Sequence, residues 1–276
     1  MNTTNSMTLL VSSRDWSGAP CSGGIWRPLV QAIVTPIALA VASFIASSAT
    51  ATLINVDFNS SGPGTSVGTF AGTGILGGGA WNGVTVNQSA QALASTSLLD
   101  STGAASGISV TIPAYQGAWN FASQPASSWK PLMGDYLYVT AAGQSTATIN
   151  LSGLGSSTAW NLVFYSASGQ GEGSNFTIGA TTKQTTDSGS IGSTLTAGDE
   201  YVVFNNIVSS GSGTLSIAWE NYGTPGSVLN GLQIQSVPEP SSVFLVSSAA
   251  LCGAAACRVR SRSRATRAGR QPAPTP

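Results

Sequence analysis

Residues 146–151 read Thr-Ala-Thr-Ile-Asn-Leu, and this alternation of polar and apolar side chains decides the fold class. Successive side chains of a β-strand point to opposite faces, so Ala147, Ile149 and Leu151 share one face and the polar residues share the other. One apolar face and one polar face are typical of an antiparallel sheet that covers a core on one side. Residues 215–219 repeat the pattern with Leu, Ile and Trp at alternate positions.

Further short runs rich in β-branched and aromatic residues lie on both sides of this stretch, separated by Gly, Ser, Asn or Pro. The clearest runs are residues 53–58, 107–112, 136–140, 147–151, 160–165, 201–208, 213–219 and 229–235. We therefore predict an all-β domain over residues 52–236, a jelly-roll-like antiparallel β-sandwich, with loops at 59–80 and 166–174. A disordered spacer is the alternative for so much Gly and Ser, but the tryptophans and apolar strands argue against it.

Charge divides the chain into three parts. Charged residues make up 7% of the 276 residues, against roughly 25% in an ordinary soluble protein. Eight of the ten basic residues lie in the two ends, so residues 52–236 hold two lysines and eight acidic residues, a formal charge of −6. A domain of that sign cannot neutralise a run of phosphates, which excludes nucleic acid as a partner.

Residue types missing from the middle exclude most catalytic centres. The chain has no histidine, and its three cysteines (Cys21, Cys252 and Cys257) all lie in the ends. The middle domain therefore has no thiolate nucleophile, histidine base, disulfide or Cys/His zinc site, and we predict no catalytic residues and no cofactor.

Two uses of the acidic residues stay open. A glycosidase needs two carboxyl groups facing one bond, and Asp199-Glu200 and Asp187 could approach Glu220 in a sandwich. Structural calcium is the other use, because oxygen ligands from Asp57, Asp187 or Glu220 suit a hard cation.

The N-terminal end has the features of a signal peptide. Residues 29–45 are almost wholly apolar, Arg27 precedes them, and Ala49-Thr50-Ala51 follows as a small-x-small cleavage signal. We expect a helical signal peptide at 1–51, cut before Thr52. An uncleaved membrane anchor is the alternative.

The C-terminal end places three signals in a fixed order over residues 237–276. Pro238-Glu239-Pro240 comes first, residues 242–257 follow without a charge, and six arginines lie within 258–270. A short apolar segment followed by arginines is expected to stop in a membrane with the arginines in the cytoplasm. The arginines nearest the apolar segment are Arg258, Arg260, Arg262 and Arg264. A buried core helix or a basic arm for nucleic acid would not explain why these blocks adjoin.

This order resembles the PEP-CTERM sorting signal of exported bacterial proteins, with Pro238, Glu239 and Pro240 as the sorting motif. The resemblance implies a membrane-sorting helix and recognition by a membrane-embedded exosortase after export by the secretion machinery. It also implies a transient membrane anchor, and then a place at the cell surface or in the extracellular matrix. Bacteria that use the system often make extracellular polysaccharide.

Aromatic residues are the candidate ligand-binding side chains of the middle domain. Trp81, Tyr115, Trp119 and Trp129 lie in Gly/Pro/Ser/Asn-rich surroundings and are expected on loops, where a flat ring can stack on a sugar. Trp160 and Trp219 fall inside strand patterns and are expected in the core.

Motifs spread over the domain also look like the jelly-roll domains of exported bacterial proteins and carbohydrate-binding modules of the galactose-binding-like class. These motifs include Asn55-Val56-Asp57-Phe58, Trp160-Asn161-Leu162 and residues 229–234. The expected function is non-catalytic binding of extracellular polysaccharide. A structural matrix protein without a specific ligand is the alternative, and a glycoside hydrolase comes third.

Overall fold

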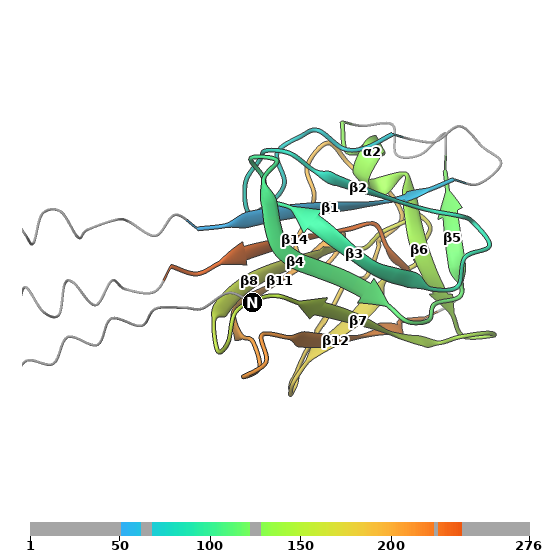
Figure 1. The fold of residues 1–276 in the computed structure, drawn as a ribbon. Coiled ribbons are helices and arrows are strands. Elements are labelled where there is room, and N and C mark those ends of the chain that lie inside the picture. The colour runs from blue at the N-terminus through green and yellow to red at the C-terminus, as the bar shows by residue number, and fades with distance from the viewer. Residues whose placement is uncertain (1–50, 62–67, 122–127, 224–225, 239–276) are drawn as a thin grey trace, which may run out of the picture. The chain divides into compact units, whose positions relative to one another are not determined.

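Strands account for almost all regular structure in the part of the chain that the computed structural model describes, residues 51–61, 68–121, 128–223 and 226–238 (Figure 1). One short helix, α2 (Lys130–Met133), is the exception within these ranges. The expected signal-peptide helix, the sorting helix and the arginine cluster lie outside the described residues. All-β architecture is therefore confirmed for the middle of the chain.

The first sheet has five strands in the order β11-β8-β14-β1-β2. The strands are β1 (Leu53–Ser60), β2 (Asn82–Val86), β8 (Ala159–Tyr165), β11 (Tyr201–Val208) and β14 (Gly231–Ser236). Neighbours run antiparallel except β1 and β2, which are parallel. That parallel pair differs from the purely antiparallel expectation.

The second sheet has six strands in the order β10-β9-β12-β7-β4-β3, all antiparallel. The strands are β3 (Leu93–Leu99), β4 (Ala105–Ile112), β7 (Thr146–Ser152), β9 (Ser174–Ile178), β10 (Thr181–Gln184) and β12 (Leu215–Asn221). The two alternating stretches of the sequence pair directly, with Leu215 opposite Leu151 and Ile217 opposite Ile149. Their apolar residues are buried and their polar residues face outward, as predicted.

The third sheet is small and antiparallel, with the order β13-β6-β5. It joins β5 (Gly117–Asn120), β6 (Asp135–Thr140) and β13 (Gly226–Leu229). In Figure 1 β5 and β6 lie at the right, while β1 begins and β14 ends at the left. Leu53 pairs with Gln235, so the two ends of the described chain leave side by side.

One apolar core lies between the two large sheets. Side chains from both sheets meet in it, including Val56 and Phe164 from the first sheet and Ile149 and Phe176 from the second. The rings of Phe164 and Phe176 stack across this core with centroids 4.6 Å apart. Trp160 and Trp219 are buried, as expected from their strand patterns. A packed core of this kind rules out the disordered-spacer alternative for the described residues and supports a β-sandwich.

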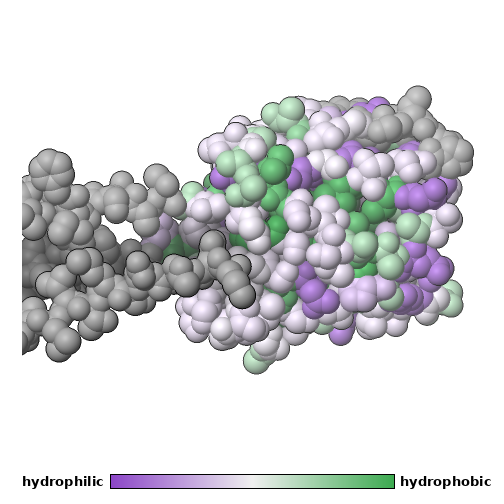
Figure 2. Space-filling model, viewed as in Figure 1, coloured by the Kyte–Doolittle hydropathy of each residue, from purple (hydrophilic) through white to green (hydrophobic). Residues whose placement is uncertain are grey.

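A second apolar cluster covers the opposite face of the first sheet. It contains Phe70, Leu132, Met133, Val163 and Tyr165. Because the sheet is covered on both faces, β1 is buried along its whole length, polar residues included. The face of the domain seen in Figure 2 is mostly white or pale, the colours of residues with hydropathy near zero, which agrees with the low charge content.

Candidate functional site

The four aromatic residues singled out from the sequence fall into three different environments. Trp119 is 46% exposed, whereas Tyr115 is 0% exposed and Trp81 and Trp129 are half-buried. Tyr115 does lie on a loop, between β4 and β5, but its ring turns into the core and no ligand can reach it there. Trp119 belongs to β5, so the expectation that it lies on a loop is wrong.

Trp81 and Trp129 pack on the two sides of Phe70. Phe70 stacks on Trp129 with centroids 5.2 Å apart, and Trp81 meets the Phe70 ring edge-on at 4.9 Å. Both indole N–H groups donate to backbone oxygens, Trp81 to Gly72 at 3.0 Å and Trp129 to Ser193 at 3.1 Å. These rings hold loops against the first sheet, which is a structural task.

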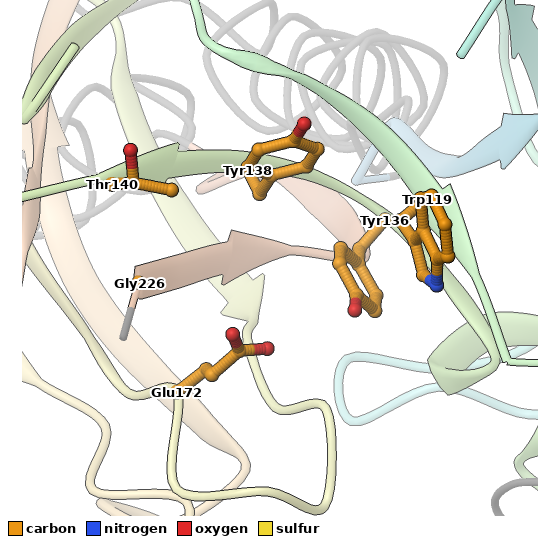
Figure 3. A pocket seen from close by; sticks show the side chains of 6 residues that line it. All are labelled: Trp119, Tyr136, Tyr138, Thr140, Glu172 and Gly226. Carbon is orange, nitrogen blue, oxygen red and sulfur yellow. The ribbon is translucent and has the colours of Figure 1, made fainter. Parts of the chain in front are cut away.

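Trp119 stands at the rim of a cleft of about 180 Å³, called the Trp119 cleft below. Its lining residues are Trp119, Tyr136, Tyr138, Thr140, Glu172 and Gly226 (Figure 3). Trp119 lies directly opposite Tyr136 in the antiparallel pair of β5 and β6, so both side chains are on one face of the third sheet. Tyr138 and Thr140 follow at alternate positions on that face, while Leu137 and Val139 turn to the core.

Gly226 keeps the floor of the Trp119 cleft open. A Cβ atom at this position would lie 2.9 Å from the carbonyl oxygen of Val139 and 3.7 Å from Oε1 of Glu172. The contact with Val139 involves a backbone atom, so a change of side-chain rotamer cannot relieve it. Any larger residue at 226 would therefore fill the space between β6 and Glu172.

Glu172 reaches the cleft from the loop between β8 and β9, and Asp187 holds that loop in place. The Asp187 carboxylate accepts hydrogen bonds from the backbone N–H groups of all five residues from 168 to 172, at 2.9 to 3.2 Å, and from the Ser168 hydroxyl. Asp187 itself has φ +46°, a left-handed conformation that Asp tolerates better than most residues. Figure 3 shows the Glu172 carboxylate turned toward the strands of the third sheet.

Burial changes the acidity of the groups in this cleft. Burial raises the pKa of Glu172, and the nearby negative charge of Asp187 raises it further, against a lowering by the Ser168 hydroxyl. Burial also raises the pKa of Tyr136 above its ordinary value, so its hydroxyl stays protonated and able to donate. The cleft thus combines one exposed indole face with hydroxyl groups and one carboxyl group.

A second groove, of about 390 Å³, separates the edge strands β2 and β3. Trp81 lines one end of it, together with small polar residues and Leu99. The side chain of Asn82 ties the two edges by donating to the Leu99 carbonyl at 2.8 Å and accepting from the Leu99 N–H at 2.8 Å. Its one aromatic lining residue, Trp81, is half-buried, and no acidic residue lines the groove.

The acidic residues considered from the sequence do not form a metal centre of three or more carboxylates. Within the described ranges no group of three or more acidic, histidine or cysteine side chains could hold a metal ion, so Asp57, Asp187 and Glu220 do not meet. Asp187 is committed to its loop, and Glu220 is exposed on β12. Asp57 is buried near Asp135, a residue that the sequence analysis did not single out.

Sequence reasoning could have found part of the Trp119 cleft. Tyr136, Tyr138 and Thr140 alternate with Leu137 and Val139 within a stretch already predicted as a strand, which puts two tyrosines on its outer face. Glu172 gave no such signal, because its position depends on a bond to Asp187, which is 15 residues away.

Of the predicted sorting motif only Pro238 is described, as an exposed residue after β14, while Glu239, Pro240 and the arginines Arg258, Arg260, Arg262 and Arg264 lie outside the described residues. None of the helices in the described ranges has the length and apolar character needed to span a membrane.

Comparison with known proteins gives little. No family model matches the chain, and no curated protein matches it. Among solved structures, a GH26-CBM35 β-(1,4)-mannanase from Podospora anserina aligns with 18% identity and a TM-score of 0.26, covering 38% of this chain and 23% of the mannanase chain. A TM-score of that size supports no argument about fold or function.

Proposed function

We propose that this protein is exported, sorted by an exosortase and held at the cell surface or in the extracellular matrix, where its jelly-roll-like domain binds polysaccharide without cleaving it. The observation that carries the binding half is the exposed ring of Trp119 beside two tyrosines and a carboxyl group in one cleft. The export half rests on the residue patterns at the two ends of the chain.

The chemistry of the Trp119 cleft suits a sugar. The C–H face of a pyranose ring is apolar and can stack on the exposed indole of Trp119. Its equatorial hydroxyls then meet groups that donate and accept hydrogen bonds, the tyrosine and threonine hydroxyls and the carboxyl group of Glu172. A volume of about 180 Å³ is below the roughly 300–1,000 Å³ of pockets for drug-sized ligands, so the cleft suits one ring or one chain end.

A single carboxyl group in the cleft supports binding without hydrolysis. Glycoside hydrolysis ordinarily needs two carboxyl groups that face the scissile bond from opposite sides. Glu172 is the one acidic residue that lines the cleft, and the carboxylate of its neighbour Asp187 is occupied by backbone N–H groups. The hydrolase reading therefore ranks below the binding reading.

The Trp119 cleft and the ends of the described chain lie near opposite ends of β1. β1 begins beside the end of β14 and runs for eight residues, about 23 Å at 3.3 Å per residue, before Ser60 bonds to Asp135 at the start of β6. Tyr136 and Tyr138 follow directly on β6.

A glycan array and a pull-down on the polysaccharide of the producing organism test the binding half. The wild-type chain is expected to bind, and Trp119→Ala is expected to lose at least tenfold in affinity at a stability cost under about 1 kcal/mol. Trp129→Ala is the matched control, since its ring packs on Phe70 and its loss should lower stability instead. Absence of binding to every glycan would leave the structural matrix protein as the better reading.

Mass measurement of secreted protein tests the export half. Removal of residues 1–51 and of the chain after about residue 238 is expected. An extracellular protein that retains its arginine tail would overturn sorting by an exosortase.

A further inference from the structure

Four buried side-chain oxygens without a hydrogen-bond partner occur at the end of β1 and the start of β6. They are Oδ1 of Asp57, Oδ1 of Asn59, Oγ of Ser60 and Oδ1 of Asp135, called the β1 oxygen cluster below. The four residues are between 0% and 4% exposed. Buried polar atoms in proteins nearly always have a partner, so these four unpaired oxygens call for a physical explanation.

Hydrogen bonds join these residues in two pairs. The backbone N–H of Ser60 donates to Oδ2 of Asp135 at 3.3 Å, and the side-chain amide of Asn59 donates to Oδ2 of Asp57 at 3.4 Å. Phe70 N–H donates to the same Asp57 oxygen at 2.8 Å. Each carboxyl group therefore uses Oδ2 to hold the backbone and leaves Oδ1 unbonded.

We propose that the β1 oxygen cluster binds a calcium ion. All four unpaired atoms are hard oxygen ligands, two from carboxylates that would balance the double charge and two from a neutral amide and hydroxyl. Ca²⁺ accepts six to eight such oxygens in an adaptable geometry, with backbone carbonyls or water completing the shell, whereas Mg²⁺ demands a near-ideal octahedron.

Thermal unfolding and calorimetric titration of the full chain, first treated with EDTA, test the proposal. CaCl2 is expected to raise the melting temperature by at least about 5 °C at saturation, and MgCl2 by much less. Asp57→Asn and Asp135→Asn should each lower the affinity for Ca²⁺ at least tenfold. Glu220→Gln, which removes an exposed carboxylate on β12, is the matched control and should bind as the wild type does.

Asn59→Ala keeps both carboxyl groups and should weaken binding to a smaller extent, which provides a readout if a carboxylate variant does not fold. A melting temperature that is the same in CaCl2 and EDTA, together with a rise in Asp57→Asn and Asp135→Asn, would show a protonated carboxyl pair and overturn the cation site.

Discussion

Asp187 is the residue whose loss should lower both the stability of the domain and its affinity for a sugar. Its carboxylate accepts five backbone N–H bonds from residues 168–172 and thereby places Glu172 in the Trp119 cleft. Asp187→Ala removes every one of these bonds, and it also puts a residue that does not favour the left-handed conformation at φ +46°.

The cost can be worked out from the exposure of the loop. Gln170 is exposed and Gly169, Gly171 and Glu172 are half-buried, so their N–H groups can turn to water once the carboxylate is gone. Ser168 is 1% exposed, and its N–H would stay unpaired. One buried unpaired donor, the loss of charge-assisted bonds and the strained backbone together give about 2–4 kcal/mol. That is a large share of the stability of an ordinary domain, but it should not unfold the protein.

Urea unfolding measures the stability loss, and hydrogen exchange of the amides of residues 168–172 measures the loop directly. Exchange at these amides should rise by orders of magnitude in Asp187→Ala while the strands β8 and β12 stay protected. Affinity for the sugar should fall about tenfold, because Glu172 is no longer held.

Asp199→Asn is the control for Asp187→Ala, since the Asp199 carboxylate bonds to Thr186 and Ser188 and accepts no hydrogen bond from residues 168–172. It should leave the exchange of residues 168–172 unchanged. If those amides remain protected in Asp187→Ala, the carboxylate does not organise the loop and the argument is wrong.

Further outcomes follow from the buried residues. In EDTA the free energy of unfolding should fall as pH rises from about 4 to 8. The pKa of Asp57 is raised from 3.8 to about 7 and that of Asp135 to about 8. The stability that these two carboxyl groups contribute is therefore fully present below pH 4 and is lost as each group ionises, at a cost of about 4 kcal/mol for Asp57 alone. Urea titrations at several pH values check this, and a stability that rises over this range would contradict it. Trp219→Ala, at a residue 0% exposed, should cost about 3–5 kcal/mol, and Trp119→Ala, on the surface, under about 1 kcal/mol; equal losses would place both rings in the core. Asn230→Ala should cost about 2–4 kcal/mol by chemical denaturation, because it leaves Ala167 N–H and the carbonyls of Met133 and Asp135 without their partner in a buried site.

The sequence predicts the strands better than it predicts what joins them. Alternation in residues 146–151 and 215–219 correctly assigns both faces of β7 and β12, because one face meets the core and the other meets water. β1 shows no such contrast, since Asp57 and Asn59 are as buried as Val56 and Phe58. A second apolar cluster over that sheet, built around Phe70, was not visible in any local pattern.

The sequence neighbours of the aromatic residues predicted the exposure of only some of these side chains. Tyr115 follows Pro113 and lies on a loop, but the depth of its ring depends on how the two sheets close. Trp119 is exposed because it alternates with the buried Ala118 in a strand at the edge of the small third sheet. Side-chain exposure on such elements is decided by tertiary packing, which local composition does not encode.

The β1 oxygen cluster and the Trp119 cleft share one strand, and this predicts that the two sites are coupled. Asp135 begins β6 and lies opposite Asn120 of β5, and the next pair along is Tyr136 with Trp119. A cation bound at Asp135 would fix the start of β6 against β1 and so reduce the motion of the strand pair that carries the sugar-binding rings. Calcium should then raise sugar affinity severalfold, and by linkage the sugar should raise calcium affinity by the same factor. Titration of sugar in CaCl2 and in EDTA measures the factor, and Asp135→Asn should abolish it while leaving the residual sugar affinity of the EDTA sample. A sugar affinity that is identical with and without calcium would mean that β6 is already rigid without the ion.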